Sequence, residues 1–287
     1  RAARAGQRAG ADEASAAALA AAPATWARRA DVVVSLATVR NRRAAYPTCF
    51  ALASAELDRI GAAASTSDLI VQGAECAAHI EDVAAVKRFR ERAVVRLQVL
   101  ADDAGAPLSM DDRSDALSNL RSLQESLGDK AGAVATAERQ RTLLDEAAAR
   151  APTPFAAMTY NWPRAEVYVY LGKGLDLVPA LERSVAALPD EYDPPYRLAW
   201  VLSKSGELEP ALAAARQALG KAYGPRKARV AMLIGDIHHL GGDLAAEQAA
   251  REEVVRIYEQ LPEGQRSRGG EKAARAALAA VRVEPAK

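Results

Sequence analysis

The sequence predicts an all-α fold, a right-handed solenoid of helical hairpins followed by a C-terminal capping helix. Three observations support this prediction. Alanine, which has the highest intrinsic helix propensity, supplies much of the hydrophobic share of 50%, whereas aromatic residues make up only 5%. Apolar residues recur at helical spacing, as in Leu117, Leu120 and Leu123. A series of large residues, small residues and glycine turns also occurs more than once towards the C-terminus, as expected of a repeat.

Residues 1–24 are expected to form an N-terminal segment that is partly disordered or a linker, because the first ten residues are rich in arginine, alanine and glycine. Within this segment an alanine-rich stretch opens at Asp12 and stops before Pro23. Thr25 is the expected N-cap of the next helix, which reaches about Ala45.

Residues 25–107 are predicted to form degenerate helical hairpins. Thr48 is an expected cap for a second helix, which Gly61 ends. A weaker repeat covers residues 67–103, where Gly73-Ala74 stands at the small-residue position. The first hairpin of this region rests only on helix length and caps.

Residues 108–262 contain the repeats that are easiest to recognise. In the clearest copy, Leu198-Ala199 is followed by the turn Gly206-Glu207, and the same order returns at Ile234-Gly235 and Gly242-Asp243. A helix can approach its neighbour closely only where one of them presents a small side chain, which explains the alternation of large and small residues. The four predicted hairpins are 114–150, 155–188, 192–223 and 228–261.

The predicted array has one irregular copy and a cap. In the hairpin 155–188, Tyr168 stands where glycine or alanine is usual, and the turn Gly172-Lys173-Gly174 is shifted. Residues 263–287 are expected to form a capping helix, from Glu271 to Val283, because a last repeat would otherwise leave its apolar face in water.

This order of residues resembles the tetratricopeptide repeat, a helix–turn–helix unit of about 34 residues. Such units cannot bury their apolar faces alone, so they stack and present a concave binding surface. The resemblance implies that the first helix of each hairpin lines a groove. Transferred to this sequence, it places in the groove Asp115, Ser118, Ser122, Glu125, Trp162, Val169, Tyr196, Trp200, Lys204, Arg229, Asp236 and His239, with Glu166 close by.

Aromatic residues are concentrated between residues 160 and 200, which hold five of the eight tyrosines and two of the three tryptophans. Aromatic side chains carry much of the energy of protein interfaces. We therefore expect a groove centred on Trp162, Tyr196 and Trp200. The competing interpretation is that these rings pack between repeats, notably around Tyr168. The residues expected to bind a partner are Trp162, Tyr196, Trp200, Lys204, Arg229, Asp236 and His239.

No catalytic residue, metal site or cofactor is expected. The sequence contains none of the common phosphate-loop, nucleophile-elbow or zinc-protease motifs. Cys76 and His79 are three residues apart on a predicted helix, but they would supply two zinc ligands where a structural site needs four. We interpret Cys76 as a buried cysteine and His79 as a surface residue. A single bridge between Cys49 and Cys76 is an open alternative that nothing in the sequence supports, and a thiol-dependent enzyme using Cys76 and His79 is another open alternative.

The charges nearly cancel, with 38 lysines and arginines against 37 acidic residues. Residues 1–43 are an exception, because eight arginines there face only three acidic residues. We do not expect nucleic-acid binding, although binding through these arginines is an open alternative. No apolar run has the length of a membrane helix, so no membrane insertion is expected.

The expected function is that of a scaffold or adaptor that binds a protein or peptide segment in the groove. Capture of C-terminal carboxylates is not expected, because Ser118 and Ser122 stand where the clamp of that subgroup needs a lysine and an asparagine. A homo-oligomer, in which the array associates with itself, is an alternative. The first residue is not methionine, which indicates a processed start or the C-terminal half of a larger, for example thioredoxin-like, protein. The compartment is open, with the cytoplasm slightly favoured and a secreted or periplasmic location as the alternative.

Overall fold

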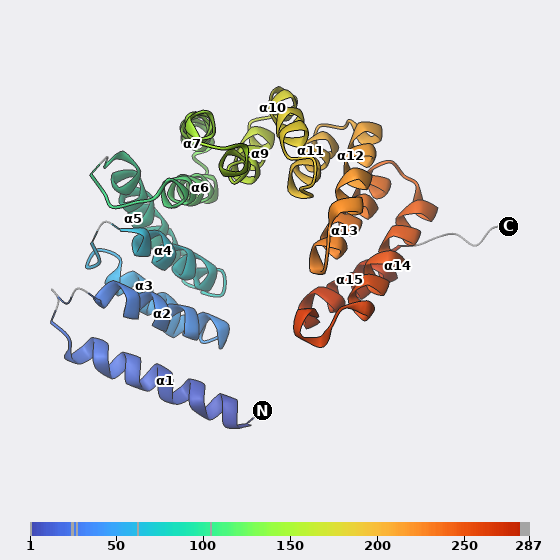
Figure 1. The fold of residues 1–287 in the computed structure, drawn as a ribbon. Coiled ribbons are helices and arrows are strands. Elements are labelled where there is room, and N and C mark those ends of the chain that lie inside the picture. Colours follow the sequence, from blue (N-terminus) through green and yellow to red (C-terminus); the bar gives the residue numbers. More distant parts are fainter. Residues whose placement is uncertain (1, 24–25, 27, 62, 104, 282–287) are drawn as a thin grey trace. The chain divides into compact units, whose positions relative to one another are not determined.

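The structure is a computed structural model that describes residues 2–23, 26, 28–61, 63–103 and 105–281. Every regular element in those ranges is a helix, and many pairs of consecutive helices pack together (Figure 1). The predicted all-α fold of helical hairpins is therefore confirmed. The chain forms two compact units, residues 1–140 (unit 1) and 141–287 (unit 2). The expected cap Thr25 and the end of the expected capping helix lie outside the described residues.

Two helices of unit 1, α5 (Val83–Asp102) and α6 (Met110–Ser126), begin where a short polar side chain accepts a hydrogen bond from one of the first backbone amides. Asp82 accepts from the amide of Ala85 at 2.9 Å, and Ser109 and Asp112 form a reciprocal capping box. The first helix begins at Ala2, ahead of Asp12, because alanine and arginine are both strong helix formers. The helices are α1 (Ala2–Ala21), α2 (Arg29–Arg42), α3 (Tyr46–Glu56), α4 (Ala64–Ala77), α5 (Val83–Asp102), α6 (Met110–Ser126) and the first part of α7 (Lys130–Arg150).

Gly73 allows three helices of unit 1 to approach one another closely. A Cβ atom at this position would clash with Ala53 on α3 and with the ring of Phe89 on α5. The expected small residue of the 67–103 repeat therefore has a packing role. Phe89 itself is almost fully buried, and Phe50 meets it edge-on with 5.4 Å between ring centroids.

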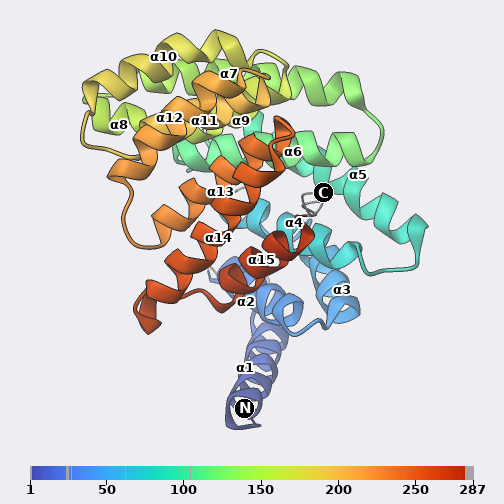
Figure 2. The ribbon, with the colours of Figure 1, turned by 90° about the vertical axis from the view of Figure 1, so that its right-hand side faces the viewer.

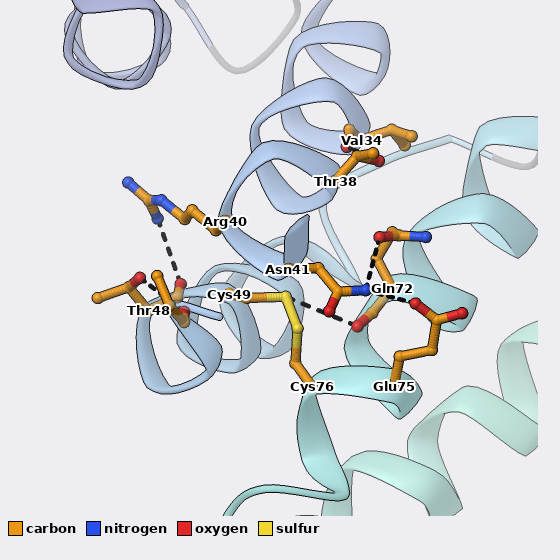
Figure 3. The surroundings of a disulfide bond; sticks show 10 residues. Val34, Thr38, Arg40, Asn41, Thr48, Cys49, Gln72, Glu75 and Cys76 are labelled. Atoms are coloured by element: carbon orange, nitrogen blue, oxygen red, sulfur yellow. Dashed lines mark hydrogen bonds between the residues drawn. A yellow bond between two sulfur atoms is a disulfide. The ribbon is translucent and has the colours of Figure 1, made fainter. Parts of the chain in front are cut away.

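A disulfide bond joins Cys49 on α3 to Cys76 on α4 (Figure 3). Both cysteines are fully buried where the two helices pack, and their Cα atoms lie 6.2 Å apart, within the range that a bridge can span. The expectation that Cys76 is buried is confirmed, and the bridge to Cys49, an alternative without support in the sequence, is present. The partner of Cys76 lies on another helix, so the sequence spacing carries no sign of the pairing. Disulfides persist mainly in oxidising compartments, which weighs against the cytoplasmic location that the sequence slightly favours.

Unit 2 contains the clearest hairpins. Its first helices, α9, α11 and α13, follow one another on one side, and their partners α10, α12 and α14 lie on the other (Figure 1). Ala199, Ala211 and Ala215 have no exposed surface, as expected of the small-residue positions. The helices are α8 (Pro154–Met158), α9 (Asn161–Tyr170), α10 (Gly174–Ala187), α11 (Asp193–Lys204), α12 (Leu208–Lys221), α13 (Pro225–Leu240), α14 (Leu244–Gln260), the 3₁₀ turn η1 (Glu263–Gln265) and α15 (Arg268–Ala280).

In unit 2, the turn between the two helices of each hairpin depends on a glycine. Gly206 and Gly242 have φ angles of +84° and +73°, a backbone region that side chains with a Cβ rarely adopt. Gly172 has a φ of +68°, and α10 begins two residues after it, as α12 and α14 begin two residues after their glycines. The turn that seemed shifted in the sequence thus has the same backbone form as its neighbours.

Helix α15 packs beside α14, as Figures 1 and 2 show. Ala274 is its buried residue, in a cluster with Val254 and Ile257 of α14. Its opening turn is capped by the hydroxyl of Ser267, which accepts from the amide of Gly270 at 3.2 Å. Within the described residues, no helix has both the length and the apolar character needed to cross a bilayer.

Candidate functional site

The seven residues expected to bind a partner all lie on the first helices of the hairpins in unit 2. Helix α9 contacts α11, and α11 contacts α13, so these helices form a continuous face. The positions are Trp162 on α9; Tyr196, Trp200 and Lys204 on α11; and Arg229, Asp236 and His239 on α13.

Four of these residues and one further cation are close together, and we call them the aromatic cluster: Trp162, Tyr196, Trp200, Lys204 and Arg197. The Trp162 and Trp200 rings meet edge-to-face, with centroids 5.0 Å apart. The Arg197 guanidinium carbon lies 4.5 Å from the Trp162 centroid and 5.0 Å from that of Tyr196. The Lys204 ammonium lies 6.0 Å from the Trp200 centroid. Cations at such distances are attracted to the ring faces.

The members of the aromatic cluster differ in exposure. Tyr196 is only 8% exposed, whereas both tryptophans are half-buried and Lys204 is exposed. Burial raises the pKa of Tyr196, and the positive charges of Arg197 and Arg229 partly offset that rise. Tyr196 is therefore positioned as a core residue, and the tryptophans are the rings that a partner can reach.

Arg197 is not among the residues expected to bind a partner from the sequence. Its guanidinium pairs with Asp193, one helical turn earlier, at 2.8 Å, while its Nε is buried without a hydrogen-bond acceptor in the structure. The pair holds the planar cation against the rings. Neighbouring aromatic residues were the signal available in the sequence, but that signal does not specify which cation would stack on them.

Asp236 and His239 belong to a charged cluster that links α13 to α14. The guanidinium of Arg251 donates to Asp236 at 2.7 Å and to Glu247 at 3.3 Å, and Nδ1 of His239 lies 2.9 Å from Glu247. Arg251 and Glu247 are 8% and 6% exposed, whereas Asp236 and His239 are 56% and 67% exposed. The two candidate residues are thus reachable from solvent but already paired. Gly235 leaves the space that the guanidinium fills.

A second candidate surface lies on unit 1, where α2, α4 and α6 enclose a hollow of about 410 Å³. The expected groove residues Asp115 and Ser118 line it, whereas Ser122 and Glu125 do not. Two further carboxylates, Asp68 and Asp112, complete its polar wall. The helices that line this hollow, α2, α4 and α6, are the first helices of their hairpins.

The residues considered for chemistry do not form a reactive site. Cys76 is consumed by the disulfide, and the ring of His79 stacks on Tyr46 with 3.7 Å between centroids. The proposed thiol-dependent enzyme therefore lacks its free thiol. In the described part of the chain, no group of three or more histidine, cysteine, aspartate or glutamate residues could hold a metal ion.

Several arginines of the basic N-terminal region are engaged in ion pairs. Arg29 forms a buried pair with Glu56 at 2.8 Å, and Arg40 and Arg43 both pair with Asp12 at 3.2 Å. The side chains that precede Asp12 lie outside the described residues. Asp12 is already one of the three acidic residues counted for this region, so of these pairs only the one with Glu56 adds negative charge beside the arginines.

Solved structures with a similar fold include a tetratricopeptide repeat protein from Parabacteroides merdae, 12% identical over 96% of this chain and 92% of its own length, with a TM-score of 0.55. BtubC from P. vanneervenii is 14% identical over 90% of this chain and 95% of its own, with a TM-score of 0.44. PilW, a type IV pilus biogenesis factor, is 16% identical over 85% and 97%, with a TM-score of 0.43. No family model and no curated protein matches the sequence. The first likeness shows the fold: this chain has a helical-repeat fold like that of the tetratricopeptide repeat protein.

Proposed function

We propose that this protein is a scaffold or adaptor that binds a protein or peptide segment on the face formed by α9, α11 and α13. The observation that carries the proposal is the aromatic cluster, in which two half-buried tryptophans from successive hairpins meet beside a stacked arginine. Tryptophan, tyrosine and arginine are the residues most enriched in the energetic centres of protein interfaces. No catalytic step is part of this proposal.

The geometry of the cluster supports binding because its side chains are already ordered. Trp162 and Trp200 hold each other in an edge-to-face contact, and Arg197 is held by Asp193. Side chains that are fixed before association lose little rotational entropy when a partner arrives. Lys204 and Arg229, both exposed, add positive charge on the same helices, which favours a partner segment that combines apolar with acidic residues.

The test is affinity capture from the native lysate, with wild type compared to the double variant Trp162→Ala/Trp200→Ala. The control is Phe155→Ala, which removes an exposed ring on α8 that lies outside the cluster. Circular dichroism should show that all three proteins keep their helices. We expect wild type and the control to retain a partner that the folded double variant loses. A partner held equally by all three would place binding elsewhere and contradict the proposal.

Sedimentation of the same proteins distinguishes the homo-oligomer alternative from binding of a different protein. If the aromatic cluster binds a second copy of this chain, wild type and the Phe155→Ala control should form a dimer that Trp162→Ala/Trp200→Ala does not. Sedimentation as a monomer at all concentrations, together with capture of another protein, would assign the face to a different partner.

A further inference from the structure

Unit 2 also contains a hollow of about 350 Å³, which is lined by α7, α8, α9 and α10, and we call it the α7–α10 hollow. None of the residues that line it belongs to the aromatic cluster. Much of its wall consists of alanines, whose short side chains leave the space open. Its polar lining consists of Asp145, Asn161, Arg164, Arg183 and Ser184.

Asn161 is a buried polar side chain that is only half satisfied within the protein. The residue is 3% exposed, and its Nδ2 donates to the hydroxyl of Ser184 at 3.0 Å. Its side-chain oxygen accepts no hydrogen bond from any residue that the structure describes. A buried acceptor without a donor is costly, so this oxygen favours a hydrogen-bond donor placed in the hollow.

The charges that line the α7–α10 hollow do not balance, because two arginines stand against one carboxylate. That carboxylate, Asp145, accepts from Arg164 at 2.9 Å and from the hydroxyl of Tyr168 at 2.8 Å. Arg141 also pairs with it, at 3.2 Å. In contrast, Arg183 is exposed on α10 and forms no ion pair with any described residue. Its guanidinium is therefore the cation that an anionic group in the hollow would meet.

A ligand that matches both features presents a carboxylate and an N–H group together. Guanidinium groups bind carboxylates through charge-assisted hydrogen bonds, which suits Arg183. The side-chain oxygen of Asn161 needs a donor, which a simple anion such as phosphate at neutral pH supplies poorly. An acidic residue within a peptide has both groups, because its backbone amide donates and its side chain carries the carboxylate. The volume lies near the lower end for ligand pockets, which suits one residue.

We propose that the α7–α10 hollow binds an aspartate or glutamate residue of a partner peptide. The carboxylate pairs with Arg183, and the backbone N–H of the same residue donates to the side-chain oxygen of Asn161. The proposal rests on the proposed function as a peptide-binding scaffold and adds a second contact site on the same unit. This site is lined mainly by the second helices α7 and α10, whereas the aromatic cluster lies on the first helices α9 and α11.

The experiment measures fluorescence anisotropy of three labelled peptides of alanine and glycine, each acetylated and amidated at its ends. The first peptide has one central glutamate, the second has glutamine there, and the third has glutamate with a methylated backbone nitrogen. We expect wild type to bind the glutamine peptide about fivefold more weakly, since an ion pair is lost. The methylated peptide should also bind about fivefold more weakly, because it cannot donate to Asn161.

The matching change in the protein is Arg183→Gln, which should bind the glutamate peptide about fivefold more weakly than wild type does. Arg183 is exposed, so this variant should keep its helices in circular dichroism. The control is Arg216→Gln, which removes the same charge from an exposed position on α12 that does not line the hollow. It should bind as wild type does.

Three results would overturn the inference: no binding of the glutamate peptide by wild type, equal binding of the glutamate and glutamine peptides, or equal binding by wild type and Arg183→Gln. Equal binding of the methylated peptide would contradict the contact with Asn161. The variant Trp162→Ala/Trp200→Ala separates the two proposals. If it binds the glutamate peptide normally but loses the captured partner, both stand. If it loses the peptide, the acidic residue binds at the aromatic cluster and the hollow is wrong. If it retains the partner, the aromatic cluster fails while the peptide result is unaffected.

Discussion

Glu247 is a buried carboxylate whose ionised form is stabilised by two neighbours. Burial alone would raise its pKa, but hydrogen bonds from His239 and Arg251 outweigh burial, so the pKa lies below its ordinary value of 4.5. A carboxylate with a lowered pKa in the folded state contributes stability above its unfolded pKa, and that contribution is lost as the pH falls through the folded pKa. The cluster should therefore weaken in acid.

We expect the unfolding free energy of wild type to fall more steeply than that of Glu247→Gln between about pH 6 and about pH 3, because the glutamine cannot titrate. Urea denaturation at several pH values would measure both slopes. The exposed residue Glu252 provides a matched control, since Glu252→Gln should keep the wild-type slope. Parallel curves for wild type and Glu247→Gln would contradict the role assigned to this carboxylate.

Single residues also show what the sequence could and could not predict. The repeat pattern predicts a small residue at position 235, and the chain has a glycine there. The structure gives a different reason for this glycine than the pattern does, because the space beside Gly235 is filled by the guanidinium of Arg251 and not by a neighbouring helix backbone. Likewise, the pattern indicates Trp162 and Tyr196 but not Arg197, which stacks on both. Periodicity carries information about size and burial, whereas the choice of polar partner depends on three-dimensional packing.

At the scale of helices, the disulfide fixes α3 against α4. The chain-entropy relation for a bridge across 27 residues gives a stabilisation of about 3.5 kcal/mol. We expect Cys49→Ala/Cys76→Ala to lower the free energy of unfolding by about that amount in urea denaturation. Wild type treated with a reductant should lose a similar amount, and the double variant should not respond to the reductant. An unchanged midpoint in the reduced protein would show that helix packing alone holds this pair.

The hairpins were predictable because their turns need a specific backbone form. A positive φ selects glycine, so Gly206 and Gly242 indicate the junctions between the paired helices directly in the sequence. The start of the 155–188 hairpin was harder to predict, because the chain there forms two helices, α8 and α9. Tyr168 occupies a position where a small residue is usual. Its ring is buried while its hydroxyl donates to Asp145 at 2.8 Å, an interaction with another helix that no local pattern indicates.

For the molecule as a whole, the near balance of 38 basic and 37 acidic residues conceals two differently charged faces. The hollow on α2, α4 and α6 is lined by carboxylates and by no basic residue among those described. The face on α9, α11 and α13 carries Lys204, whose ammonium lies 6.0 Å from the Trp200 centroid, and the exposed Arg229 on α13. The net charge is a sum over all residues of the chain, so it could not predict where charged side chains gather. The charges of these two faces become separate only when the first helices of the hairpins are folded.

The whole array also depends on how its final repeat is covered. Helix α15 buries Ala274 against Val254 and Ile257, and without it this apolar surface would meet water. We expect deletion of residues 268–287 to lower the urea midpoint of unfolding and to produce concentration-dependent association in sedimentation velocity, because exposed apolar patches drive self-association. Deletion of residues 282–287 is the control, since it keeps α15, and it should behave as the intact chain does. A monomeric 268–287 deletion with an unchanged midpoint would mean that α14 can end the array by itself. In that case the apolar contacts of α15 would contribute no more to the free energy of unfolding than those of an ordinary surface helix. The capping role predicted from the repeat pattern would then be wrong.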